Sequence, residues 1–228
     1  MSNTIVPTSR RRLVALVVGA AAAIAFIALR LIVAAGEHEP LAVDIWWHDL
    51  MVADRSDVWI AVAWVPAIVG GTIGMIVVGA VLIACFLWRG RRADAVTLAV
   101  SMIIVVAIGA TMAAVLGRTR PEDSLAESMA TSFPSGHTAV ATTVAVVLGL
   151  LLRRSYVWIL GAVWVLTMMW SRTYLHAHWL SDVVAGMLEG IAVATLVWVA
   201  IEAARDRHAA RAVGASSNEQ PSESVTNS

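Results

Sequence analysis

Three short polar segments interrupt an otherwise strongly apolar chain. They are residues 117–123 (GRTRPED), 133–137 (FPSGH) and 171–182 (SRTYLHAHWLSD). Together they supply arginine, serine, glycine, histidine and aspartate, the residue types that bind oxyanions and transfer protons. Taken singly, they could be a solvated turn, a helix cap and an interfacial loop. Taken together, they predict a site for a phosphate-like anion beside acid–base groups.

The second segment has the features of an anion site at a helix N-terminus. In FPSGH, Ser135 can cap the helix and Pro134 shapes the approach of the chain. Because Gly136 has no side chain, an anion can come close to the N–H groups at the positive end of the helix dipole. Arg120 and Arg172 add planar, permanently charged guanidinium groups suited to the other phosphate oxygens.

The third segment places a histidine four residues before an aspartate. On a helix, His178 and Asp182 would share one face within hydrogen-bonding reach, whereas His176 would not share it with Asp182. A zinc site made by His137, His176, His178 and Asp182 is also conceivable. The two arginines favour an oxyanion instead, and sensitivity to chelators would distinguish the two sites.

These motifs resemble the three-part signature of the type-2 phosphatidic acid phosphatase superfamily. The matching residues are RP at 120–121, PSGH at 134–137 and SRxxxxxHxxxD at 171–182. The family includes membrane lipid phosphatases and the soluble vanadium haloperoxidases, and the resemblance extends over about residues 43–203. One departure is Ala113, which stands where the family usually has a lysine. Arg118 could compensate for that lysine or be an ordinary loop arginine.

The resemblance implies a metal-independent phosphatase with a phosphohistidine intermediate and no cofactor. His178 would attack phosphorus while Asp182 holds its other ring nitrogen, and His137 would protonate the leaving group and later activate water. The residues implied to bind the phosphoryl group are Arg118, Arg120, Ser135, Gly136 and Arg172. Vanadate-dependent peroxidase chemistry shares the anion site but fits poorly with six membrane spans.

The composition is that of a membrane protein. Of the 228 residues, 59% are hydrophobic and 14% are charged, and the mean hydropathy is +0.79, which excludes an ordinary soluble domain. Apolar stretches near the roughly 20 residues needed to cross a bilayer lie at 13–35, 67–88, 93–116, 137–152, 157–172 and 180–203. The predicted fold is therefore all-α, with six transmembrane helices in a phosphatase domain at 13–203. A cytoplasmic N-terminus at 1–12 and a disordered cytoplasmic tail at 204–228 complete the prediction.

An interfacial amphipathic helix is predicted between spans 1 and 2. In LAVDIWWHDLMV (41–52), the apolar residues share one helical face and Asp44 and His48 lie on another, as in a helix on a membrane surface. The second span is placed after Pro66, because this proline with Gly70 and Gly71 would break a longer helix.

Arginine placement predicts the orientation. Short cytoplasmic loops retain positive charge, and arginines cluster at 10–12, 89–92, 153–154 and 205–211, all on one side of six spans. Both termini of a multi-pass protein of the plasma (inner) membrane are therefore predicted in the cytoplasm. The same parity places the three polar segments, and with them the active site, on the outer face.

The predicted function is hydrolysis of a phosphate or diphosphate ester of a lipid. The preferred substrate is undecaprenyl diphosphate, converted to undecaprenyl phosphate; phosphatidate and phosphatidylglycerol phosphate are alternatives. A non-catalytic membrane protein that retains the fold is a further alternative, favoured by Ala113. The expected partners are the lipid substrate and the membrane, with no nucleic acid, and the oligomeric state is left open. The single cysteine, Cys85, excludes an intramolecular disulfide.

Overall fold

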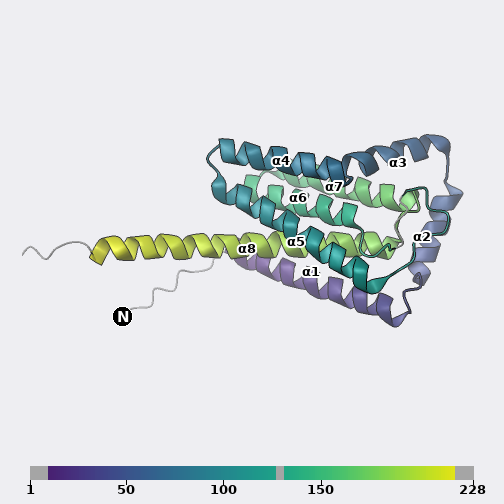
Figure 1. The fold of residues 1–228 in the computed structure, drawn as a ribbon, viewed down its shortest axis with the longest axis horizontal. Helices are drawn as coiled ribbons and strands as arrows, with labels where there is room; N and C mark the ends of the chain where they lie inside the picture. Colours follow the sequence, from purple (N-terminus) through teal and green to yellow (C-terminus); the bar gives the residue numbers. More distant parts are fainter. Residues whose placement is uncertain (1–9, 127–130, 219–228) are drawn as a thin grey trace, which may run out of the picture.

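Helices are the only regular elements in residues 10–126 and 131–218, which the computed structural model describes. They are α1 (Arg10–Ala35), α2 (Ala42–Ala53), α3 (Asp57–Val69), α4 (Thr72–Trp88), α5 (Arg92–Leu116), α6 (Gly136–Leu152), α7 (Ser155–Tyr174) and α8 (Leu180–Asn218). Most run along one axis as a bundle, in which α8 packs most extensively against α1 and α6, and α2 crosses one end (Figure 1). The all-α prediction is confirmed for these residues.

Five of the six predicted apolar stretches each fall within one helix, and the second, 67–88, runs from the end of α3 through α4. By length and composition, α1, α5 and α8 can each cross a membrane, and the bent pair α3–α4 adds a fourth span if it counts as one. The apolar helix α6 has only 17 residues. These helices support a multi-pass membrane protein, and the number of six spans stays a prediction.

Large apolar side chains cover the sides of the bundle. Ile73, Trp88 and Ile103 are 80%, 85% and 68% exposed, and many other aliphatic residues on these helices are similarly uncovered. In water, such a surface would drive association. In a bilayer it needs no protein partner, because lipid tails are as apolar as leucine.

The helix break near the second predicted span does not fall at Pro66, where the sequence predicts it. Pro66 lies inside α3, and the chain is already helical from Asp57. The break falls at Gly70 and Gly71, and the helices on either side of it are bent by 48°. Two consecutive glycines have low helix propensity and end α3, whereas a proline near a helix end can be accommodated inside it.

The predicted disordered tail is helical over most of its length. α8 continues past residue 203 to Asn218, and residues 219–228 lie outside the described part of the chain. The segment is polar but rich in alanine and arginine, which extend a helix that is already nucleated. Arg205 pairs with Glu202 at 2.8 Å, and Arg12 of α1 pairs with Asp206 at 2.8 Å.

The arginine-bearing segments meet at the end of the bundle away from α2 (Figure 1). Arg11 donates to the carbonyl of Leu150, and Arg91 donates to the carbonyl of Leu151 at 3.2 Å. Both carbonyls belong to the last turn of α6, where positive charge is favourable for the helix dipole.

Two glycines allow α8 to approach α6 closely near the opposite end. A Cβ at Gly186 would lie 2.5 Å from the Ser135 carbonyl, and one at Gly190 would lie 2.6 Å from the Ala139 carbonyl. Small residues four apart are a common means of bringing helix backbones together in membranes. This contact holds the starts of α6 and α8, which carry two of the polar segments, against each other.

Replacing Gly190 with Ala should force α6 and α8 apart and destabilise the protein by about 1–3 kcal/mol. The measurement is the midpoint of thermal unfolding in detergent, which we expect to fall. Gly109→Ala in α5 is the matched control, because the nearest atom to its new Cβ would be 3.9 Å away. An unchanged midpoint for Gly190→Ala would contradict the close helix approach.

Candidate active site

Backbone hydrogen bonds bring the three polar segments together at the end of the bundle crossed by α2 (Figure 1). The N–H of Ser132 donates to the carbonyl of Arg118 at 2.8 Å, and the N–H of Ser135 donates to the carbonyl of Asp182 at 3.0 Å. Residues 14 and 47 positions apart in the sequence are therefore joined at one site.

His178 is buried, and its two ring nitrogens have different neighbours. Its Nδ1–H donates to the Ser132 carbonyl at 2.7 Å, and its Nε2 lies 3.3 Å from Nη1 of Arg120. A carbonyl oxygen can only accept, so Nδ1 carries the proton and the neutral ring has its lone pair on Nε2. The unprotonated nitrogen is therefore the one beside Arg120.

Asp182 does not make the hydrogen bond to His178 that their spacing on a helix predicts. Its Oδ2 lies 3.8 Å from Nδ1 of His178, too far for a hydrogen bond, and accepts the backbone N–H of Trp179 at 2.9 Å. The reason is that α8 begins at Leu180, so His178 precedes the helix. Asp182 is the third helical residue, a position that commonly bonds the N-cap N–H. Asp182 thus orders the turn after His178 while its charge stays near the ring.

Arg118 is the residue whose position differs most from the prediction. It is fully buried between Asp182 and Asp44, and its Nη2 lies 2.7 Å from Asp44 Oδ2. It also donates to Ser181 Oγ at 2.8 Å and to the carbonyls of residues 38 and 39, each at 3.3 Å. All three guanidinium nitrogens are engaged within the protein. In this geometry Arg118 holds Asp182 and Asp44 in place.

Asp44 supports the site in a way that sequence reasoning missed. It is fully buried and accepts the N–H and the hydroxyl of Ser181, both at 2.7 Å, as well as the N–H of Leu41 at 2.9 Å. These bonds join α2 to the start of α8. The sequence feature that could have indicated this role is the helical spacing of Asp44 and His48. It places two ionisable groups on one face of α2, and this face turns toward the bundle.

The start of α6 has the openness expected of an anion site. Gly136 is exposed, and no heavy atom lies within 4 Å of the position where its Cβ would be. The first N–H groups of a helix lack intrahelical acceptors and carry partial positive charge. Ser135 occupies the N-cap position, but its hydroxyl lies 3.2 Å from the Thr138 hydroxyl and makes no cap bond to the backbone.

Two arginines border the same region. Arg120 donates through Nη2 to the Thr131 carbonyl at 2.8 Å and through Nη1 to the Ala177 carbonyl. Arg172 is buried at the end of α7, and its carbonyl accepts the N–H groups of Ala177 at 3.0 Å and His178 at 3.2 Å. The turn that carries His178 therefore wraps around the backbone of Arg172.

His137 lies in the first turn of α6, beside the break between α3 and α4. Its Nε2 is 3.8 Å from the point where a Cβ at Gly71 would stand. Gly71 thus also leaves room next to the histidine of the second polar segment.

Burial lowers the pKa of His178, and the charges of Arg172 and Arg120 lower it further against the opposing effect of Asp182. The ring therefore stays neutral below the ordinary histidine pKa of about 6.5. A neutral imidazole with a directed lone pair can act as a nucleophile or a general base.

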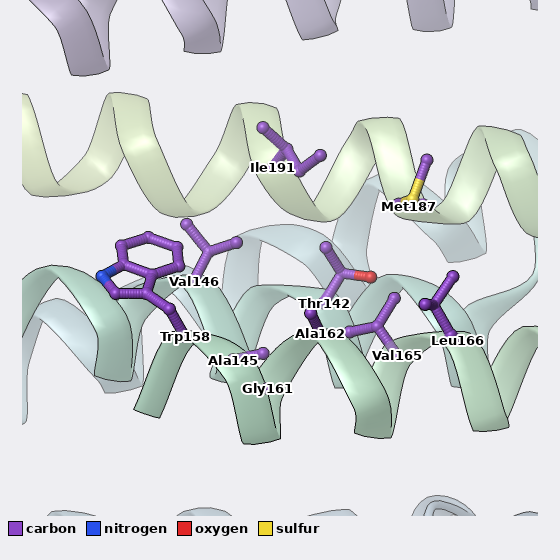
Figure 2. A pocket seen from close by; sticks show the side chains of 10 residues that line it. All are labelled: Thr142, Ala145, Val146, Trp158, Gly161, Ala162, Val165, Leu166, Met187 and Ile191. Atoms are coloured by element: carbon purple, nitrogen blue, oxygen red, sulfur yellow. The ribbon is translucent and has the colours of Figure 1, made fainter. Parts of the chain in front are cut away.

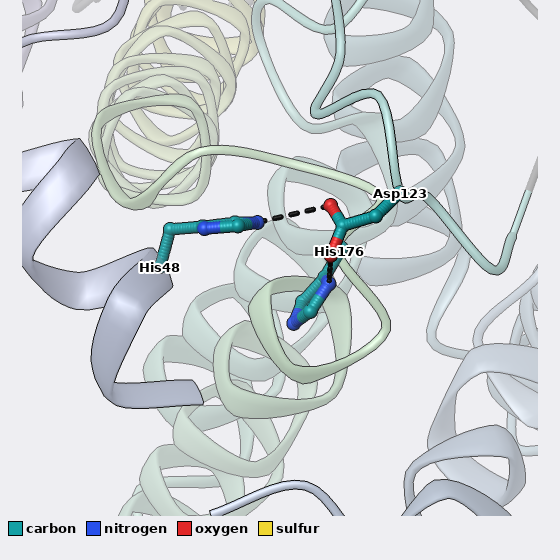
Figure 3. Close-up of side chains that lie close together, drawn as sticks. All are labelled: His48, Asp123 and His176. Carbon is teal, nitrogen blue, oxygen red and sulfur yellow. Dashed lines mark hydrogen bonds and ion pairs between the residues drawn. The ribbon is translucent and has the colours of Figure 1, made fainter. Parts of the chain in front are cut away.

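A second cluster of ionisable side chains consists of His48, Asp123 and His176 (Figure 3). Nε2 of His48 lies 3.0 Å from one Asp123 oxygen, and Nδ1 of His176 lies 2.5 Å from the other. Burial acts to raise the pKa of Asp123, yet hydrogen bonds from the two histidines leave it below its ordinary value. Burial lowers the pKa of His176, although Asp123 opposes this.

His176 does not join the zinc site considered as an alternative. It bonds Asp123, and the one group of three or more possible metal ligands found within residues 10–126 and 131–218 is His48, Asp123 and His176. The backbone of His176 is left-handed, with φ of 52°, which costs a residue with a Cβ about 1–2 kcal/mol.

Residues 94–206, which contain all three polar segments, match the PAP2 superfamily. The chain belongs to the PAP2 superfamily. A relative named undecaprenyl-diphosphatase, from Sulfolobus acidocaldarius, is 34% identical over 111 residues. That match covers 46% of this chain and 53% of the relative, so the chain spans about half the length of the relative.

Two crystal structures are similar in fold to this chain. One is a transmembrane PAP2-type phosphatidylglycerolphosphate phosphatase from Bacillus subtilis, with a TM-score of 0.69 and 21% identity over 78% of this chain and 93% of that one. The other is Aquifex aeolicus LpxE, with a TM-score of 0.61 and 20% identity over 69% of this chain and 96% of that one. These similarities establish the helical arrangement.

Two apolar cavities lie along the PAP2 bundle instead of at its histidines. One of about 260 Å³ is formed by α6, α7 and α8, and its lining includes Thr142 and Met187 (Figure 2). A second, of about 430 Å³, lies between α4, α6 and α7. Thr142 follows His137 by five residues, and Met187 follows Asp182 by five. The first cavity therefore begins about 8 Å along the helices from the polar site.

Replacing Asp44 with Ala should destabilise the protein by about 3–5 kcal/mol, because Arg118 would remain as a buried charge with one carboxylate lost. We expect a much lower unfolding midpoint in detergent. Asp49→Ala in the same helix is the control, since its side chain is 75% exposed. Equal midpoints for the two variants would contradict the supporting role of Asp44.

Proposed function

We propose that this chain is an integral membrane lipid phosphatase that hydrolyses a phosphate or diphosphate ester through a phosphohistidine. The observation that carries the proposal is the pair of contacts at His178, whose Nδ1–H is held by Ser132 at 2.7 Å while Nε2 lies 3.3 Å from Arg120. A lone pair beside a guanidinium is arranged to attack an anion that the guanidinium binds. Membership of the PAP2 superfamily supports the same reaction class.

In the first step, Nε2 of His178 attacks phosphorus, so that a P–N bond forms and the bond to the leaving oxygen breaks. Protonated His137 gives its proton to that oxygen. Arg120, Arg172 and the N–H groups at Gly136 bind the other phosphoryl oxygens as their charge redistributes.

In the second step, water attacks phosphorus, the P–N bond breaks and inorganic phosphate is released. His137 accepts the proton from water. The phosphorylated ring is positively charged, and the Asp182 carboxylate, 3.8 Å from Nδ1, stabilises that charge. The arginines, the helix end and the Ser135 hydroxyl stabilise the phosphoryl oxygens in both steps, so we propose no metal ion or cofactor in the chemistry.

Undecaprenyl diphosphate is the substrate we favour, with undecaprenyl phosphate as the product. The support is the relative named undecaprenyl-diphosphatase, at 34% identity over about half of each chain. The apolar cavity between α6, α7 and α8 would receive part of the isoprenoid chain (Figure 2). Phosphatidate and phosphatidylglycerol phosphate offer the same phosphoryl chemistry and remain the alternatives.

Phosphate release from a lipid panel tests this function. Purified protein in detergent would receive undecaprenyl diphosphate, phosphatidate or phosphatidylglycerol phosphate, and kcat/KM should be highest for the first. A preference for a glycerophospholipid would change the substrate and keep the reaction class. No release from any lipid would favour the non-catalytic alternative.

His137→Ala removes the general acid and should lower kcat by about 10²–10⁴-fold. His178→Ala removes the nucleophile and should lower kcat at least as much. A ³²P-labelled substrate should leave an acid-labile label on the wild-type protein and none on His178→Ala. His208→Ala, at an exposed position of α8, is the matched control. Wild-type phosphate release by His178→Ala would overturn the mechanism.

We also propose six spans, with both termini in the cytoplasm and the site at the outer face of the plasma (inner) membrane. The support is the separation of charge along the bundle. Arg11, Arg12 and Arg91 make their contacts at the end away from α2, and positive charge marks the cytoplasmic side.

Single-cysteine labelling of intact cells tests this orientation. In a Cys85→Ser background, Glu122→Cys should react with a membrane-impermeant thiol reagent, because this exposed position lies on the side of the site. Ser155→Cys, exposed at the start of α7, should react only after the membrane is opened. The reverse pattern would invert the protein and leave the chemistry unchanged.

A further inference from the structure

We propose that His48, Asp123 and His176 bind a divalent transition-metal ion, best matched by Zn²⁺, at a site separate from the phosphatase residues. One ligand atom from each residue lies within 4.8 Å of the others. Figure 3 shows the two rings meeting at the Asp123 carboxylate, one at each oxygen. Two imidazoles and one carboxylate are a ligand set that zinc accepts, with a fourth position left for water or another ligand.

The two histidine nitrogens lie 3.0 and 2.5 Å from the Asp123 oxygens, and one ligand atom of each residue lies within 4.8 Å of the others, so metal binding requires only small shifts of these side chains. Zinc bonds nitrogen and oxygen at about 2.0–2.2 Å, so ligand atoms around it stand about 3.5 Å apart. The Asp123 side chain is 40% exposed and that of His176 is fully buried. The site therefore has an entry from solvent on one side and a fixed ligand on the other.

The surroundings of the two rings suit metal ligands. Nδ1 of His48 lies 3.8 Å from the Asp49 carboxylate, which a small shift would let accept a hydrogen bond from Nδ1–H once the metal binds Nε2. Ligating histidines usually have such an outer carboxylate. Nε2 of His176 is buried and has no hydrogen-bond partner among the described residues, so the His176 ring forms hydrogen bonds to no group other than Asp123.

The backbone at His176 gives an independent reason to assign it a role. Its φ of 52° belongs to the left-handed region that glycine adopts without strain. A histidine persists in such a conformation only when its surroundings hold it there, and strained residues cluster at functional sites. The proposed phosphatase chemistry does not use this side chain.

Arg55 is the charge that opposes metal binding. Its Nη1 lies 3.7 Å from Asp123 Oδ2, and its side chain is 33% exposed. A cation at this carboxylate must compete with the guanidinium, so removal of Arg55 should strengthen metal binding.

The metal would join three segments around the candidate active site. His48 belongs to α2, Asp123 follows Arg120 by three residues, and His176 precedes His178 by two. A bound ion would fix α2 against the two loops that carry Arg120 and His178. The proposal concerns binding alone and holds whether or not the chain is a phosphatase.

Zinc titration of the full-length protein tests the site. The protein would carry a tag without histidine, be treated with EDTA and dialysed in detergent, and then be titrated with Zn²⁺ by calorimetry. We expect one saturable equivalent, a rise in the unfolding midpoint with Zn²⁺, and a visible Co²⁺ spectrum of a four-coordinate ion. His48→Gln and Asp123→Asn should each bind at least about ten-fold more weakly.

Matched variants make the result specific. His208→Gln should bind like wild type, and Arg55→Gln should bind equally or more tightly. The unfolding midpoints of His48→Gln and Asp123→Asn are measured without metal and compared with that of metal-free wild type. Similar midpoints show that a variant has lost metal binding and not its fold. No saturable Zn²⁺ binding, or wild-type affinity in a well-folded His48→Gln, would overturn the proposal.

Discussion

One buried arginine joins the parts of the molecule that make the site. Arg118 lies fully buried between Asp44 of α2 and Asp182 of α8. Removing a guanidinium from water is unfavourable unless charged partners and hydrogen bonds replace the solvent, and two carboxylates, a hydroxyl and two carbonyls do so here. Each element needs the others, because loss of one carboxylate would leave an uncompensated buried charge. The crossing position of α2 follows from this pairing.

The same pairing determines how His178 is held. Asp182 accepts bonds from Arg118 and from the Trp179 backbone, so its oxygens are committed to ordering the turn before α8. The proton on His178 is directed instead by the Ser132 carbonyl, at 2.7 Å. A carbonyl fixes the tautomer without adding a charge, and the nearby Asp182 still favours a positive ring. Orientation and charge stabilisation therefore come from different groups.

The charged side chains whose contacts are described above lie at the two ends of the bundle, and each end has a distinct character. The sides expose aliphatic residues, as expected for contact with lipid. Arginines bond carbonyls of α6 at one end. The other end holds the phosphate-binding candidates and the cluster of His48, Asp123 and His176. A lipid headgroup and aqueous phosphate can both reach such an end, whereas the bundle interior would exclude them.

Local pattern in the sequence was sufficient for most of the helices and for the three motifs, because apolar runs and N-terminal helix residues report burial and capping within a few positions. It did not predict the start of α3 at Asp57 or the continuation of α8 past residue 203. Local pattern did not distinguish Arg118 from Arg120, which is two residues later. Arg118 is buried in ion pairs, whereas Arg120 borders His178. Local pattern also missed Asp44, whose partner lies 74 residues away. Only the tertiary structure decides such roles, since a buried polar group takes its partners from whichever elements pack around it.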